Sequence, residues 1–160
     1  MKKKLFFAGM AALLLTFGLV VASCGGGDDG GTPFDGATLA GTKWVAIQSN
    51  VPYPFGAGLS MDMKATLEFT SDTAGTATVD VTKWNGDWDA DTKEKAQGMM
   101  AQDEDNGAFT STYDAATKTG TYTLKSGTTG TFTVNVEKKE LTTTEVDEDG
   151  ETETIIYKLQ

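Results

Sequence analysis

The chain has no histidine and no arginine, and its only cysteine is Cys24. Lack of histidine removes the usual general base and every serine–histidine arrangement for nucleophilic catalysis. Lack of histidine and of further cysteines also removes the ligands on which zinc and copper sites depend. Carboxylate pairs remain, but we expect the acidic residues in turns and on outward strand faces, where their pKa values are hard to tune. These absences favour a binding or interaction protein without cofactor over an enzyme.

Positive charge is scarce beyond the first few residues. Three of the 13 lysines are residues 2–4, whereas all 23 acidic residues follow Cys24. Ten lysines against 23 acids give the part from Cys24 onward a formal net charge of −13. Such a surface repels phosphate backbones, so we expect no nucleic-acid partner. It suits a basic protein partner, divalent cations or solubility alone.

The first residues have the form of an export signal. Three lysines precede the apolar run Leu5–Val21, which ends at small residues before Cys24. The stretch Leu19–Cys24 resembles the lipobox of bacterial lipoproteins, which implies cleavage before Cys24 and acyl chains, such as palmitate, on that cysteine. Several acyl carbons on one residue would give firm membrane anchoring. The alternative is an uncleaved transmembrane helix, but the run is short for a span and no stop-transfer charges follow it.

The resemblance to lipoproteins also implies a location in the cell envelope. Gly25 is not the aspartate that often retains such proteins in the inner membrane, so the outer membrane is the expected destination. Whether the domain faces the periplasm or the cell surface stays open. We expect residues 1–23 to be the signal peptide, residues 24–38 a glycine-rich acidic tether, and residues 39–160 one folded domain.

From Leu39 onward the apolar residues recur with a period of two, which is typical of half-buried strands. Segments containing Asp, Ser or Gly separate the alternating stretches and predict the turns. Eight strands result, and closing them into an antiparallel up-and-down barrel would leave no exposed edge. An open sandwich of the same strands is the alternative. The expected strands lie around residues 41–49, 61–70, 76–81, 109–113, 121–124, 131–136, 141–143 and 155–159.

The start of the first expected strand is similar to that of lipocalin-like proteins. Leu39–Trp44 reads Leu-Ala-Gly-Thr-Lys-Trp, with two residues between glycine and tryptophan where the lipocalin pattern has one. The resemblance implies a small barrel with Trp44 at its base. Trp44 can equally be an ordinary core residue, because buried aromatic side chains dominate protein cores.

Two long connections, Asn50–Ser60 and Asn85–Gly107, fall on the barrel end opposite the tether in an up-and-down topology. Long loops that persist in compact domains are often functional, although these loops can instead plug the barrel. We expect a short helix from Asp91, which forms a capping-box spacing with Glu94. The side chains expected to form the rim and lid of a ligand site are Tyr53, Phe55, Trp88, Met99 and Met100.

Asp87, Asp89 and Asp91 have the spacing of the first half of a calcium-binding loop. Position six is Thr92 rather than glycine and position twelve is Gly98 rather than glutamate, so a solvated acidic loop is the main alternative. Asp103, Glu104 and Asp105 add further oxygens nearby. We therefore expect no metal centre, with weak calcium binding at Asp87–Asp91 left open.

The preferred interpretation is a barrel that binds a small hydrophobic or amphipathic ligand at its membrane-distal mouth. Inward tyrosines, Tyr113, Tyr122 and Tyr157, would supply polar points within an apolar space. The alternative is a filled barrel whose acidic loops bind a basic macromolecular partner, similar to small barrel-shaped lipoprotein inhibitors of lysozyme. Ionic strength separates the two, because salt screens a charged partner but not an apolar ligand.

Overall fold

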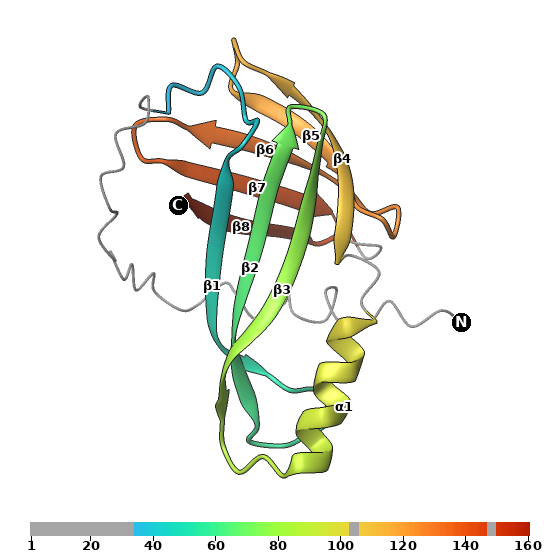
Figure 1. Ribbon diagram of the computed structural model, residues 1–160. Coiled ribbons are helices and arrows are strands. Elements are labelled where there is room, and N and C mark those ends of the chain that lie inside the picture. Colours follow the sequence, from blue (N-terminus) through green and yellow to red (C-terminus); the bar gives the residue numbers. More distant parts are fainter. Residues whose placement is uncertain (1–33, 103–105, 147–149) are drawn as a thin grey trace.

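The structure, a computed structural model, describes residues 34–102, 106–146 and 150–160. Within these residues the chain forms a closed eight-stranded antiparallel barrel and one helix, which confirms the all-β prediction (Figure 1). The elements are β1 (Lys43–Pro52), β2 (Ser60–Ser71), β3 (Ala74–Asn85), α1 (Ala90–Ala101), β4 (Gly107–Asp114), β5 (Thr119–Thr123), β6 (Thr129–Asn135), β7 (Glu140–Val146) and β8 (Thr152–Leu159).

Each strand pairs with the next along the chain, and β1 pairs with β8 to close the barrel. The closing pairs are Trp44 with Leu159 and Val45 with Lys158. This short seam excludes the open sandwich, because a sandwich would leave the first and last strands on free edges. The up-and-down order also puts the two longest connections at the same end, as the strand count predicts.

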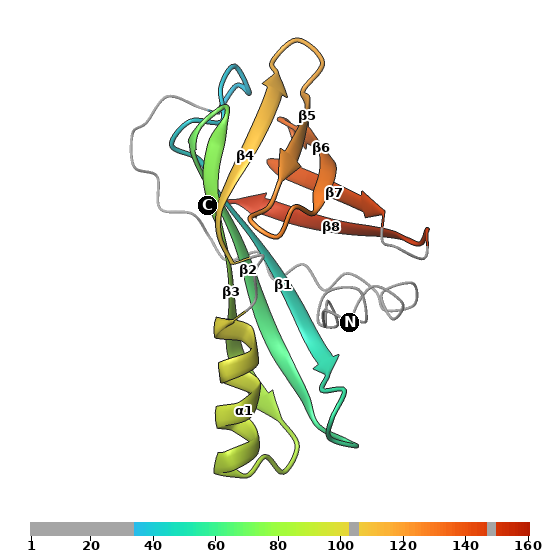
Figure 2. The ribbon, with the colours of Figure 1, turned by 90° about the vertical axis from the view of Figure 1, so that its right-hand side faces the viewer.

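The strands β1, β2 and β3 are longer than the barrel needs. β2 and β3 pair from Ser60 opposite Asn85 to Ser71 opposite Ala74. By contrast, β3 pairs with β4 only from Ala74 to Ala77. The remaining lengths of β1 to β3 therefore project from the barrel as a three-stranded ribbon, which carries α1 (Figures 1 and 2).

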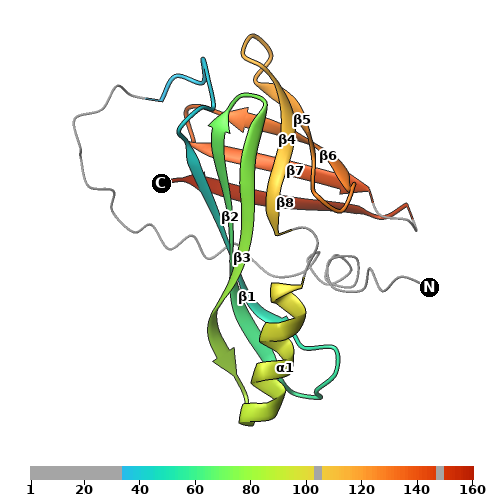
Figure 3. The same ribbon diagram turned by 45° about the vertical axis from the view of Figure 1, so that its right-hand side comes forward.

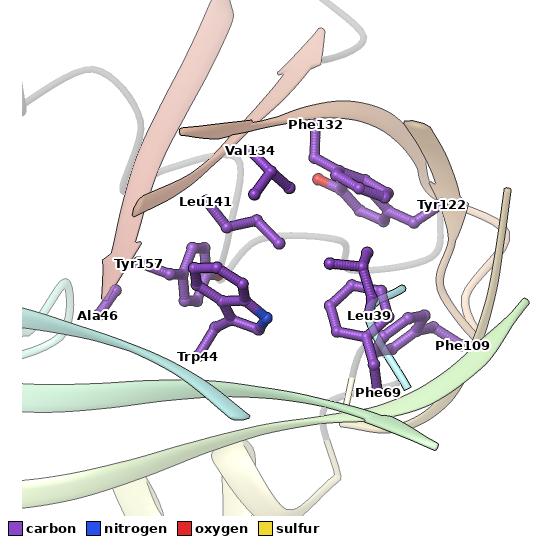
Figure 4. Packing of buried hydrophobic residues seen from close by; sticks show 10 residues of the cluster. All are labelled: Leu39, Trp44, Ala46, Phe69, Phe109, Tyr122, Phe132, Val134, Leu141 and Tyr157. Carbon is purple, nitrogen blue, oxygen red and sulfur yellow. The ribbon is translucent and has the colours of Figure 1, made fainter. Parts of the chain in front are cut away.

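The barrel interior is packed with side chains from nearly all the strands (Figure 4). Phe69 is central, with its ring centroid 5.1 Å from that of Phe109 and 5.8 Å from that of Phe132. Offset and edge-to-face ring pairs of this kind add to the stabilisation from burial alone. The buried members of this main core are Leu39, Trp44, Ala46, Phe69, Phe109, Tyr122, Phe132, Val134, Leu141 and Tyr157.

Residues 34–42 close one end of the barrel, which we call the base. Leu39 is fully buried there, and its backbone N–H donates to the Asp72 carboxylate at 2.6 Å. The Phe34 ring packs edge-on against Trp44, with 5.4 Å between centroids. The Gly36 carbonyl accepts hydrogen bonds from the Tyr113 hydroxyl at 2.7 Å and from Lys118 at 2.8 Å. Phe34 and Gly36 thus contact the barrel, although composition assigns both to the tether.

The three-stranded ribbon has its own core, which α1 completes. Figure 3 shows α1 lying beside these strands. Ala96 and Met100 of α1 are buried against Met61 and Met63 of β2. The next alternate residues of β2 line the barrel, so α1 covers the continuation of the barrel's inner face. This second core consists of Val51, Tyr53, Met61, Met63, Ala96 and Met100, with Leu59, Val79, Val81, Trp84 and Trp88 packed around them.

The helix begins slightly earlier than the sequence predicts. Asp89 is its N-cap residue, because its carboxylate accepts hydrogen bonds from the Thr92 backbone N–H at 2.7 Å and the Thr92 hydroxyl at 2.9 Å. These hydrogen bonds lower the pKa of Asp89 below its ordinary value. The predicted start at Asp91 is therefore wrong: Asp91 lies in the first turn, where its charge favours the helix N-terminus.

Candidate functional site

Of the five side chains expected to form a rim and lid, Tyr53, Phe55 and Trp88 lie together beside the outer end of the ribbon, whereas Met99 and Met100 lie in the last turn of α1. Tyr53 and Met100 are buried in the second core, whereas Phe55 is 65% exposed and Met99 is 37% exposed. The Tyr53 ring lies 4.9 Å from that of Trp88 and 5.7 Å from that of Phe55, measured between centroids. Tyr53, Trp88 and Met100 therefore have a packing role of their own, and ligand contact by the five stays a prediction.

Trp88 is held by the ribbon rather than left free to close over the barrel. Its indole N–H donates to the Asn85 carbonyl at 2.9 Å and to the Ser60 carbonyl at 3.2 Å. The indole also packs on Trp84, with 4.6 Å between ring centroids. Trp88 is thus held by two backbone carbonyls and two aromatic rings, which fits a structural role beside α1 better than a role in a mobile lid.

A cavity of about 50 Å³ opens at the barrel end opposite the base, which we call the mouth. Its wall combines apolar side chains with tyrosine hydroxyls and carboxylates, as small-molecule sites commonly do. The described residues that line this mouth cavity are Ala65, Thr66, Leu67, Ala77, Thr78, Val79, Asn106, Tyr122, Leu124, Thr143, Glu145, Glu153, Ile155 and Tyr157.

Glu145 and Glu153 are site residues that the sequence analysis missed. It places acidic residues in turns and on outward faces, which is wrong for these two, because both line the mouth cavity. The signal was present in the alternation. Glu145 continues the inward series of Leu141 and Thr143 on β7, and Glu153 precedes Ile155 by two residues on β8. Extending the period of two by one step in each strand would have found both.

The two carboxylates affect the pKa values of the two tyrosines that line the cavity. The Tyr122 hydroxyl donates a hydrogen bond to Glu145 Oε1. Burial, followed by the negative charge of Glu145, raises the pKa of Tyr122 well above its ordinary value. Burial, followed by the charges of Glu145 and Glu153, likewise raises the pKa of Tyr157. Both hydroxyls therefore stay protonated near neutral pH and act as hydrogen-bond donors rather than as bases.

Asn106 joins the mouth cavity to the ribbon. Its side-chain oxygen accepts a hydrogen bond from the Val79 backbone N–H at 2.8 Å. Val79 lies beyond Ala77, the last residue of β3 that pairs with β4. Its side-chain nitrogen donates to the Met100 carbonyl at 2.9 Å, near the end of α1. The amide thus satisfies backbone groups of a strand and a helix at once, and it fixes α1 beside the cavity.

The volume of the mouth cavity limits what it can hold. One buried water needs a cavity of about 10–15 Å³. A cavity of about 50 Å³ therefore accommodates a few non-hydrogen atoms. The rest of the barrel is filled by the main core, as is common for eight strands. A large lipid therefore does not fit inside this interior, whereas the end group of a smaller molecule does.

The calcium-like spacing has a structural explanation in the part of the chain that the structure describes. Asp89 uses both carboxylate oxygens to cap α1. No group of three or more metal-ligating side chains comes together among the described residues, and Asp103, Glu104 and Asp105 lie outside them. Cys24 also lies outside them. No helix within the described ranges has the length and apolar character needed to cross a bilayer.

The fold and the cavity together define a small closed antiparallel barrel with an acidic, partly apolar mouth. No protein family, curated protein or solved structure matches the chain. The functional argument therefore depends on the residues and their geometry. Trp44, which carries the lipocalin-like resemblance, is fully buried near the base, with its indole N–H donating to the Thr42 hydroxyl at 2.8 Å.

Proposed function

We propose that this protein is a lipid-anchored lipoprotein of the bacterial envelope that binds a small amphipathic ligand in the mouth cavity. The observation that carries the proposal is the wall of that cavity, where apolar side chains face two tyrosine hydroxyls and two carboxylates. The anchor is Cys24 in the outer membrane, as the lipobox-like sequence implies. Residues 34–42 close the base, so the chain that follows a lipid on Cys24 would join the barrel at its base. The mouth would then face away from the membrane.

The proposal is for binding rather than catalysis. The tyrosine hydroxyls are held in their neutral form, since burial and nearby carboxylates raise their pKa values. The chain has no histidine to serve as a base near neutral pH. The arrangement therefore supports recognition of a ligand by shape, hydrogen bonding and charge.

Native mass spectrometry of the processed chain, extracted from bacterial envelopes in mild detergent, tests the proposal. We expect a noncovalent adduct of low mass that is lost on denaturation. Ala77→Leu should remove the adduct, because three added carbons would fill the cavity that Ala77 lines. Thr76→Leu is the matched control, since Thr76 is exposed on the same strand. An adduct that survives Ala77→Leu, or no adduct after exposure to an envelope extract, would contradict the proposal.

A second candidate function is an acidic interaction protein that binds a basic macromolecule, such as a lytic enzyme that it inhibits. The small size of the cavity and the filled main core favour it. So does the formal charge of −13 from Cys24 onward, which ten lysines against 23 acids produce. Capture of a basic protein that is lost in high salt, with no low-mass adduct, would support this candidate instead.

A further inference from the structure

Glu145 and Glu153 lie side by side at the mouth. They are directly opposite one another in the antiparallel pairing of β7 with β8. Both side chains line the cavity rather than the outer surface. The β-carbons of opposite residues are about 4.5–5.5 Å apart, and like charges in such pairs repel and destabilise the sheet. A positively charged group placed between or beside the two carboxylates would reduce this repulsion.

The charge of this pair acts on the whole cavity. Both tyrosines at the mouth have raised pKa values to which the nearby carboxylates contribute. Charges interact more strongly in a partly buried site than in bulk water, because the surrounding medium is less polarisable. An anionic ligand would be repelled here, and a neutral one would gain no charge–charge attraction, only hydrogen bonds to the carboxylates.

Much of the remaining cavity lining is apolar. Ala65 and Leu67 of β2, Ala77 of β3, Leu124, and Ile155, which lies two residues from Glu153 on β8, provide it. A volume of about 50 Å³ accommodates a few non-hydrogen atoms, such as a nitrogen and its first carbons. The remainder of a longer ligand would then lie outside, at the mouth.

We propose that the mouth cavity binds an alkylammonium group, with its nitrogen at Glu145 and Glu153 and its carbon chain against Leu67, Leu124 and Ile155. This inference rests on the proposed function, because it names the chemistry of the ligand for the same cavity. The group can belong to a small free amine or to the lysine side chain of a basic protein. The second source would combine the cavity with the acidic surface in one interaction.

The test compares two probes of equal size, butylammonium and butan-1-ol, on the processed full chain in nanodiscs of zwitterionic lipid. Binding is followed by the NMR signals of the Ile155 and Leu124 methyl groups. We expect butylammonium to bind about tenfold more tightly, because its positive charge is attracted by both carboxylates whereas the hydroxyl of butan-1-ol is neutral. Added salt should weaken the binding of the amine and leave that of the alcohol unchanged.

Glu145→Gln supplies the decisive variant. It removes one charge and keeps an acceptor for the Tyr122 hydroxyl. We expect about a tenfold loss of butylammonium affinity with butan-1-ol affinity unchanged. Glu68→Gln is the matched control, because it removes the same charge from an exposed residue of β2 that lies 3.8 Å from Lys43. This control should leave both affinities near those of the unmodified chain.

The outcomes separate the two proposals. Equal affinities for amine and alcohol, or equal effects of Glu145→Gln and Glu68→Gln, would overturn the alkylammonium assignment while leaving the cavity as a binding site. No saturable shift with either probe would overturn the proposed function itself. A further arm uses Nα-acetyl-lysine N-methylamide: its binding supports a protein lysine as the natural occupant. Binding of butylammonium without it supports a free amine.

Discussion

Three glycines of the barrel wall lie opposite aromatic residues of the neighbouring strand. Gly75 pairs with Phe109, Gly120 with Phe132 and Gly130 with Tyr122. In each case the ring lies over the glycine, where a β-carbon would come within 2.4, 2.3 and 2.5 Å of a ring or hydroxyl atom, respectively. The missing side chains thus make room for the rings of the main core. At these positions glycine serves packing, since none of the three has a positive φ.

Two substitutions to alanine should therefore have opposite effects. Gly120→Ala is expected to lower the free energy of unfolding by about 2 kcal/mol or more, because the new β-carbon would also lie 2.2 Å from the Thr112 carbonyl oxygen. Gly98→Ala is expected to raise it by about 0.5–1 kcal/mol, because Gly98 lies within α1 with open space around it. Urea unfolding followed by tryptophan fluorescence measures both. A stable Gly120→Ala variant would contradict the packing described for the main core.

Sequence alternation predicted individual residue orientations well where a strand is flanked by clear turns. It identified Tyr122 and Tyr157 as inward, and both are buried. It failed at Glu145 and Glu153 because charged residues are expected outside unless they are paired or functional. An acidic residue at an inward position of a strand is therefore a candidate site residue. The period-two pattern shows that it points inward, whereas its polarity alone predicts that it points outward.

At the level of elements, the sequence did not reveal that β3 extends to Asn85, nor that the outer parts of β1 to β3 leave the barrel as a ribbon. Residues 50–60 and 85–107 have the composition of long loops, with prolines, glycines and acidic residues. In the structure, Val51 instead belongs to β1 and to the second core, which α1 completes. Such pairing depends on contacts with a helix distant in sequence, and local periodicity does not report those contacts.

The start of α1 illustrates the same limit. Asp89 and Asp91 are both good capping residues, so propensity alone does not separate them. The anchoring of Trp88 to the Asn85 and Ser60 carbonyls places the turn immediately before Asp89. Tertiary contacts therefore select the cap.

Asp89→Ala should loosen α1 without unfolding the barrel. The change removes both hydrogen bonds to Thr92, and the helix otherwise buries only Ala96 and Met100. We expect faster amide hydrogen exchange in residues 92–101, with the exchange of β5 to β7 unchanged. Asp91→Ala is the matched control and should have the smaller effect. Equal exchange in the two variants would show that the N-cap is not Asp89.

For the whole molecule, the architecture separates stability from recognition. The base is closed by residues 34–42, the barrel is filled by the main core, and the second core attaches α1 to the ribbon. The mouth remains, with a small cavity between apolar and acidic walls. Fold class and strand number followed from the sequence, because period-two alternation and turn residues specify them directly. The cavity did not, because it depends on how the ends of eight strands meet.

The most direct test of the central claim is a crystal structure of the processed chain with its co-purified ligand retained. We predict ligand density at the mouth, in contact with Leu124, Ile155 and Tyr157, and close to Glu145. Density against Phe55 and Trp88 at the ribbon, with the mouth cavity empty, would contradict the claim and would place the site at the residues that the loops first suggested.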